Sequence, residues 1–202
     1  SANGYWEATE NGKRWNSFVK RAEAHNTVVI NPGSENEFPV DYSCEIVEMH
    51  STDSEALAIM DLSSAQQKNA YLAYRGFKLT DNRKSLVIRD EITLKSSSRL
   101  YWFMQTDANV EINSRGAVLT QNGKSMKLEF TTNAETYEIS AAPARSLDTS
   151  GIIYDNRMNS TRIAIALTGS ENVNITVKLT PENIEGSALS EHNLPLSSWT
   201  DS

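Results

Sequence analysis

Residues 117–130 read AVLTQNGKSMKLEF, and this stretch decides the fold class. Asn122 and Gly123 lie between two runs in which apolar and polar side chains alternate. Because this pair tolerates the positive φ angles of a tight type I′ turn, the stretch predicts an antiparallel β-hairpin. Residues 173–179, VNITVKL, alternate in the same way. Their odd-numbered side chains are expected to face a core, and their even-numbered side chains are expected to face water.

The same alternation returns along the chain, and a sustained apolar stripe of helical period is almost absent. Further strands are predicted at residues 27–30, 57–60, 85–92, 99–104 and 161–167. Turn-forming residues separate the strands at 31–36, 80–83 and 147–151. At most one short helix is predicted, over residues 63–74, with Ser63 as its N-cap. The pattern predicts an all-β fold, an antiparallel β-sandwich that forms a single domain over residues 1–202.

Composition narrows the functional classes. Hydrophobic residues make up 39% of the 202-residue chain and charged residues 22%, as in an ordinary globular protein. We expect neither a membrane span nor a secretion signal within these residues, because apolar runs are short. The net charge of −7 disfavours DNA, whose phosphates must be met by cations, so no nucleic-acid partner is expected. An anionic sugar stays open, since a few cations in one groove act locally.

Motifs of common enzyme classes are missing from the sequence. His25, His50 and His192 form no HExxH pattern, and no serine-hydrolase elbow, P-loop or dinucleotide-binding motif occurs. Asp90 and Glu91 are adjacent carboxylates, but neighbours on a strand point to opposite faces. A salt bridge or a solvated charge is therefore expected for them rather than a catalytic pair.

Cys44 is the single cysteine, so no disulfide can form within the chain. We expect its side chain to be buried as a small apolar group. Trp102 and Phe103 point to opposite faces of a predicted strand, so at least one of them is expected in the core. Trp199 is expected on a closing strand that packs onto the sandwich.

A phrase around His25 carries a family resemblance. Residues 21–31 read RAEAHNTVVIN, and related phrases occur at residues 4–6, 61–63, 74–76, 87–91 and 102–104. In this order they resemble the C-terminal β-sandwich domain of the heparinase II/III-like polysaccharide lyases, over residues 4 to about 130. Beyond Phe130 the sequence is compatible with a sandwich and carries no specific likeness.

The resemblance implies a supersandwich-like domain that follows an N-terminal α/α toroid in a larger lyase. Such enzymes cleave uronate-containing polysaccharide, glycosaminoglycans included, by β-elimination. The reaction needs a group that neutralises the uronate carboxylate, a base and an acid. In the family the tyrosine and the carboxylate-neutralising Asn or His belong to the toroid, and a further His comes from sandwich strands that would precede Gly4. No catalytic residue is therefore assigned here, and the 202 residues are expected to be inactive alone. The implied partners are an anionic polysaccharide and the toroid, and the implied location is the bacterial periplasm or exterior.

His25 matches a histidine that helps to hold a structural metal in the family, zinc in the best-known relatives. Its carboxylate partners would precede Gly4, so the resemblance implies zinc in the full-length enzyme and little or none bound by these residues alone. The alternative is a histidine that starts a strand and donates a hydrogen bond to a neighbouring loop. His50 and His192 are expected on the surface.

One basic and aromatic cluster suggests sugar recognition. Its members are Tyr5, Trp6, Lys13, Arg14, Trp15, Lys20 and Arg21. Aromatic faces stack on pyranose rings, and Arg binds carboxylate or sulfate in bidentate fashion, so Trp15 and Arg21 are predicted to bind substrate. Two other functions stay open from sequence. They are a non-catalytic carbohydrate-binding or interaction module, and a stand-alone glycosidase that uses carboxylates such as Asp90.

Overall fold

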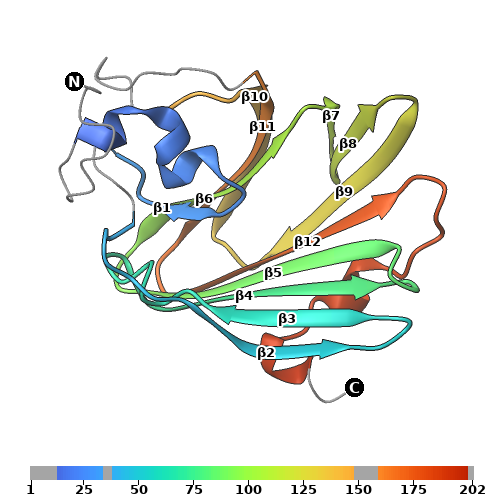
Figure 1. The fold of residues 1–202 in the computed structure, drawn as a ribbon, viewed down its shortest axis with the longest axis horizontal. Helices are drawn as coiled ribbons and strands as arrows, with labels where there is room; N and C mark the ends of the chain where they lie inside the picture. Colours follow the sequence, from blue (N-terminus) through green and yellow to red (C-terminus); the bar gives the residue numbers. More distant parts are fainter. Residues whose placement is uncertain (1–12, 34–37, 148–158, 200–202) are drawn as a thin grey trace.

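The computed structural model describes residues 13–33, 38–147 and 159–199. Its strands form two antiparallel sheets (Figure 1), which confirms the predicted β-sandwich. One sheet has four strands in the order β1-β6-β11-β10, and the other has eight in the order β2-β3-β4-β5-β12-β9-β8-β7. The described residues contain 3₁₀ turns but no α-helix. None of their helical segments is long and apolar enough to cross a membrane.

The strands include every segment predicted from alternation. The four-stranded sheet contains β1 (Val28–Ile30), β6 (Ser98–Thr106), β10 (Thr136–Pro143) and β11 (Thr161–Gly169). The eight-stranded sheet contains β2 (Glu45–Ser51), β3 (Ala56–Asp61), β4 (Ala70–Thr80), β5 (Ser85–Leu94), β7 (Asn109–Asn113), β8 (Gly116–Gln121), β9 (Lys124–Thr132) and β12 (Asn172–Pro181). The 3₁₀ turns are η1 (Lys13–Asn16), η2 (Phe18–Lys20), η3 (Ala22–Ala24), η4 (Leu189–His192) and η5 (Leu196–Ser198).

The hairpin of β8 and β9 forms as predicted. Gln121 pairs with Lys124 across a two-residue turn, and Asn122 and Gly123 have φ angles of 52° and 73°. Positive φ at both central positions is the requirement of a type I′ turn, whose twist matches that of the strands. The Asn-Gly pair therefore fixes the register of this end of the larger sheet.

The helix predicted over residues 63–74 was wrong, because turns occupy residues 63–69 and β4 begins at Ala70. The Ser63 hydroxyl accepts a hydrogen bond from the backbone N–H of Ala73 at 3.0 Å instead of capping a helix. Gln66 reaches across the sandwich and donates to the Val28 carbonyl at 2.8 Å. These tertiary hydrogen bonds outweigh a weak helix propensity.

The main core lies between the two sheets. Its buried members come from both, with Ile163 and Ile165 on the smaller sheet and Ile175 and Val177 on the larger one. Trp102 belongs to this core, while Phe103 is buried on the opposite face of β6. The expectation that at least one of the two aromatics is in the core is confirmed. Burial of each such side chain stabilises the fold by about 1.5–3 kcal/mol.

Part of the outer face of the larger sheet, over β3, β4, β5 and β12, is covered by residues 184–199, which we call the C-terminal segment. Thr176 and Lys178 were expected to face water, but their exposed fractions are 0% and 1%. Trp199 packs onto the sandwich as expected, yet it follows the 3₁₀ turn η5 and not a strand. A Cβ atom at Gly76 would overlap the Leu196 side chain, so glycine permits this close approach. The polar side of β12 is therefore an internal surface.

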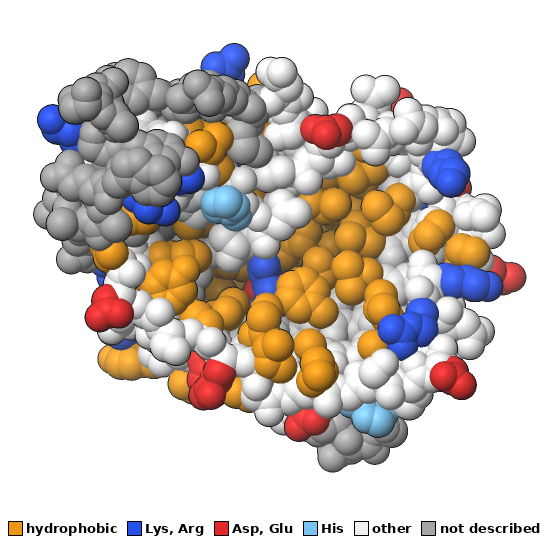
Figure 2. All heavy atoms as spheres, in the orientation of Figure 1, with side chains coloured by type: hydrophobic (Ala, Val, Ile, Leu, Met, Phe, Trp, Pro, Cys, Tyr) orange, Lys and Arg blue, Asp and Glu red, His pale blue; other side chains and the backbone are white. Residues whose placement is uncertain are grey.

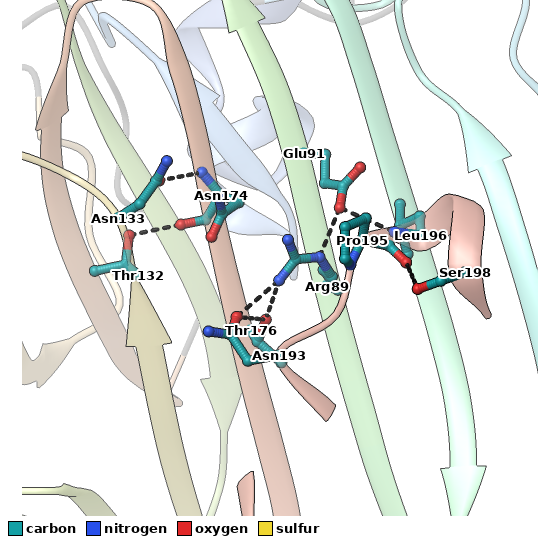
Figure 3. A network of polar contacts seen from close by, with 10 residues as sticks. All are labelled: Arg89, Glu91, Thr132, Asn133, Asn174, Thr176, Asn193, Pro195, Leu196 and Ser198. Atoms are coloured by element: carbon teal, nitrogen blue, oxygen red, sulfur yellow. Dashed lines mark hydrogen bonds and ion pairs between the residues drawn. The ribbon is translucent and has the colours of Figure 1, made fainter. Parts of the chain in front are cut away.

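Polar contacts fix the C-terminal segment to the sheet (Figure 3). Arg89 donates to the Thr176 hydroxyl at 2.8 Å and to the Asn193 side-chain oxygen at 2.9 Å, and it pairs with Glu91 at 2.7 Å. Glu91 also accepts the backbone N–H of Leu196 at 3.0 Å. Asp90 points to the other face, as predicted for adjacent strand residues, so the two carboxylates do not share a cleft.

His192 was expected on the surface, but it is half-buried in a polar cluster of this segment. Its Nε2 lies 2.6 Å from the Ser187 hydroxyl oxygen, which accepts a hydrogen bond from Lys178 at 2.8 Å. Lys178 also forms an ion pair with Asp81 at 2.9 Å. Because Lys178 is buried and charged, it needs these partners, and they bring His192 close to its ammonium group.

We expect the C-terminal segment to loosen on mild acidification. Burial lowers the pKa of His192 and the Lys178 charge lowers it further, against the opposing carboxylates of Asp81 and Glu191. The folded state thus favours the neutral imidazole, and stability is lost as pH falls below the unfolded value of 6.5. Between about pH 7.5 and about pH 5.5, the midpoint of thermal unfolding should fall further for the wild type than for His192→Gln. An equal fall in the midpoint for both proteins would contradict this role of His192.

The edge strand β2 is the most exposed strand of the larger sheet. All of its residues are exposed, and so are residues 40–44 before it. Cys44 lies in this stretch and is exposed, so the prediction that it is buried was wrong. Cys44 is exposed because no other segment in the described part of the structure packs over residues 40–51.

Candidate functional site

A cleft of about 510 Å³ lies where the 3₁₀ turns η1 to η3 meet residues 38–42, beside the start of β1. Its charged and aromatic lining comes from Arg14, Trp15, Lys20, His25, Phe38 and Tyr42. The predicted residues Trp15 and His25 thus come together in one site. Tyr5 and Trp6 of the predicted cluster lie outside the described residues.

The turns that carry the cleft are anchored by apolar packing beneath them. Phe18 is buried against Ala24 and Ala144, although it is flanked by the polar residues of η1 and η2. Above it, the Arg14 guanidinium lies 5.3 Å from the centre of the Trp15 ring. A cation over an aromatic face is attracted by the ring quadrupole, which orients both side chains at the cleft.

Arg21 is placed differently from the other cations. Its side chain is fully buried and forms an ion pair with Glu23 at 3.1 Å, and it donates to the Gly33 carbonyl. Glu23 in turn accepts hydrogen bonds from the Ser146 hydroxyl at 2.7 Å and from the Leu147 backbone N–H at 2.9 Å. These contacts give Arg21 a role in holding the turns beside the smaller sheet. Its predicted contact with substrate stays a prediction, and the cations that line the cleft are Arg14 and Lys20.

His25 is exposed at the mouth of the cleft, and a buried ion pair fixes the backbone next to it. Arg75 donates to the Asn26 carbonyl at 2.8 Å and binds both carboxylate oxygens of Asp90, at 2.6 and 3.0 Å. The Asn26 side chain accepts the backbone N–H of Gln105 at 2.7 Å. Three of the phrases that carry the family resemblance therefore meet at this point.

The pairing of Arg75 with Asp90 was missed as a feature of the site. Both residues belong to phrases of the resemblance, and the sequence predicted either a salt bridge or a solvated charge for Asp90, with no partner named. The two residues face each other directly in the β4–β5 register. Opposite charges at predicted strand positions were the available signal, but the register that pairs them depends on the turn between the strands.

A metal ion at His25 would need several further ligands. No three His, Cys, Asp or Glu side chains among residues 13–33, 38–147 and 159–199 come close enough together to hold an ion. Structural zinc takes four ligands, so His25 with the described residues does not make such a site. Zinc in the full-length enzyme stays a prediction.

The electrostatics of the cleft favour an anionic ligand. Among the described residues, its lining contains two cations, Arg14 and Lys20, and no carboxylate, in a chain whose net charge is −7. The shifted pKa values of Asp81 and His192 arise at the C-terminal segment, and neither residue lines the cleft. Burial alone would raise the pKa of Asp81, but hydrogen bonds from neighbours that include Lys178 and Ser187 hold it well below its usual range. The described lining thus places positive charge next to aromatic rings.

Comparisons with known proteins show which solved structures have a similar fold. No family model and no curated protein matches the sequence. The structure is similar to heparan sulfate lyase HepC from Pedobacter heparinus, with a TM-score of 0.64 and 12% identity over 84% of this chain and 26% of that one. It is also similar to a heparinase III, the BT4657 gene product, with a TM-score of 0.61 and 17% identity over 82% and 24%. The chain spans about a quarter of the length of these structures, and the resemblance inferred from sequence is confirmed for the fold.

Proposed function

We propose that these residues are the β-sandwich domain of a larger lyase that cleaves uronate-containing polysaccharide by β-elimination. The observation that carries the proposal is the cationic and aromatic cleft, which occurs on a sandwich similar in fold to structures named as a heparan sulfate lyase and a heparinase III. The cleft would contact the anionic chain, and the catalytic groups would lie in another part of the enzyme. A bacterial periplasmic or extracellular location belongs to the same proposal.

The chemistry of the cleft fits a uronate or sulfated sugar. Arg14 and Lys20 can donate charge-assisted hydrogen bonds to carboxylate or sulfate, each worth about 1.5–3 kcal/mol. Trp15 contributes an aromatic ring to the cleft, beside the Arg14 guanidinium. In β-elimination the C5 proton passes to a base, the bond between C4 and the leaving oxygen breaks, that oxygen takes a proton from an acid, and a double bond forms between C4 and C5. The cleft supplies binding for this reaction and no base or acid is assigned to it.

Trp15→Ala in the full-length enzyme is expected to weaken binding of a uronate oligosaccharide about tenfold, or about 1.4 kcal/mol, through loss of the stacking surface. Isothermal titration calorimetry measures the affinity. Trp15→Phe should retain most of it, and Lys124→Ala, an exposed lysine of the β8–β9 turn, should leave it unchanged. Equal affinities of wild type and Trp15→Ala would contradict a role of the cleft in substrate binding.

A second candidate is a carbohydrate-binding module without a catalytic partner, which the same cleft favours because it is suited to binding. Formation of unsaturated uronate by the full-length protein separates the two. The product absorbs ultraviolet light and appears only if the protein is a lyase. Binding without product would favour the module.

A further inference from the structure

Strand β2 has the side-chain pattern of a strand that is buried on one side. Ile46, Met49 and Ser51 lie opposite Met60, Ala58 and Ala56 of β3 and so point to the inner face of the sheet. Glu45, Glu48 and His50 point to the outer face. Yet the exposed fractions of Ile46 and Met49 are 58% and 72%. The apolar side of this strand is built for burial that the described residues do not supply.

The inner face beside β2 is hollowed and apolar. A depression of about 370 Å³ is lined by Met49, Ala56, Ala58, Phe77, Leu79 and Leu86, among others. Figure 2, in the orientation of Figure 1, shows hydrophobic side chains gathered in a continuous patch where the two sheets open away from each other. Exposed apolar patches of this kind are rare on soluble monomers and mark interaction sites.

This hollow continues the main core. Phe77 and Leu86 pack against the buried core cluster and also line the hollow. The smaller sheet reaches the larger one near β4, where Arg75 and Gln66 bind the backbone of residues 26–28. The outer face of β3 to β5 is already covered by Leu196 and Trp199. Of the two faces at this end of the larger sheet, the inner one therefore lacks a partner in the described structure.

We propose that another part of the same larger enzyme, outside these 202 residues, packs as an apolar layer on the inner face of β2, β3 and β4. This inference rests on the proposed function, since similar lyase structures are about four times as long as the part matched here. A layer in this position would extend the sandwich core over Met49 and Phe77. A second copy of the chain is the less suitable occupant, because two chains that each carry a net charge of −7 repel each other.

Hydroxyl-radical footprinting of the full-length enzyme tests the proposal at Met49. Its oxidation should be several-fold slower in the native enzyme than in the denatured enzyme, after correction for oxidant dose. Oxidation at the denatured rate would overturn the inference. Protection that disappears on dilution, together with a dimer mass by light scattering, would assign the surface to a second copy and would also overturn it.

Met49→Asp in the full-length enzyme should lower the midpoint of thermal unfolding by several degrees, because it places a charge in an apolar contact. Leu194→Asp is the matched control, since Leu194 is an exposed apolar residue on the C-terminal segment. Equal midpoints for the two variants would contradict the buried contact. A protein that shields Met49 but forms no unsaturated product would contradict the proposed function and leave this interface standing.

Discussion

Arg75→Ala is expected to lower the free energy of unfolding by about 3–5 kcal/mol, because it leaves a buried carboxylate without its counter-ion. The exposed fractions of Arg75 and Asp90 are 4% and 3%, so water cannot replace the lost partner. The variant also removes the donor to the Asn26 carbonyl, which fixes the chain beside His25. Urea unfolding followed by tryptophan fluorescence measures the change.

Two further variants distinguish the effect of losing the ion pair from the effect of losing any arginine side chain. Arg99→Ala removes an exposed arginine of the smaller sheet and should change stability by less than about 0.5 kcal/mol. The double variant Arg75→Met, Asp90→Leu removes both charges and should recover much of the loss. A loss for Arg75→Ala as small as for Arg99→Ala would contradict the role given to the pair.

Trp199→Ala is expected to cost about 3–5 kcal/mol, the usual range for truncating a large buried aromatic side chain. Trp199 closes a satellite core with Leu57, Ile59 and Val87 on the outer face of the larger sheet. Its loss should release η5 and expose the ion pair of Arg89 and Glu91 to water. Hydrogen exchange at the backbone of residues 196–199 would report this release alongside the unfolding free energy.

Leu194→Ala is the control for this variant, because Leu194 belongs to the same segment but is exposed. This variant should leave the free energy of unfolding nearly unchanged. If Trp199→Ala unfolds at the same urea concentration as Leu194→Ala, the C-terminal segment does not contribute to the core. The polar side of β12 would then have to be stabilised by other contacts.

The fold was largely predictable because short stretches of neighbouring residues encode its strands and turns. Alternation located the strands, and the Asn-Gly pair fixed the β8–β9 hairpin. Alternation could not say what covers the polar side of a strand, so the burial of Lys178 was missed. That burial depends on residues 184–199 folding back over the sheet, which is a contact between distant segments.

The candidate site was predictable in part for the same reason. Trp15 and His25 are close in sequence to the cations of the turns, and the structure brings them to one cleft. Arg21 was indistinguishable from its basic neighbours by sequence. Its burial depends on Glu23, on the Gly33 carbonyl and on contacts of Glu23 with residues 146–147, which no local pattern encodes.

Several residues behind the family resemblance are explained by packing and not by catalysis. Arg75 and Asp90 hold the backbone at Asn26, and Gly76 leaves room for Leu196. These positions shape the domain around the start of β1, where His25 meets the cleft. Their role in a lyase would be to present the cleft in a fixed position to the rest of the enzyme.

Ultraviolet absorbance of unsaturated uronate is the measurement that tests the central claim most directly. The full-length enzyme, offered heparan, chondroitin and alginate in turn, should form this product from at least one of them, and the 202 residues alone should form none. Product from the 202 residues alone would contradict the assignment of the catalytic groups to another part of the enzyme. A full-length enzyme that forms no product from any uronate polymer would contradict the lyase itself.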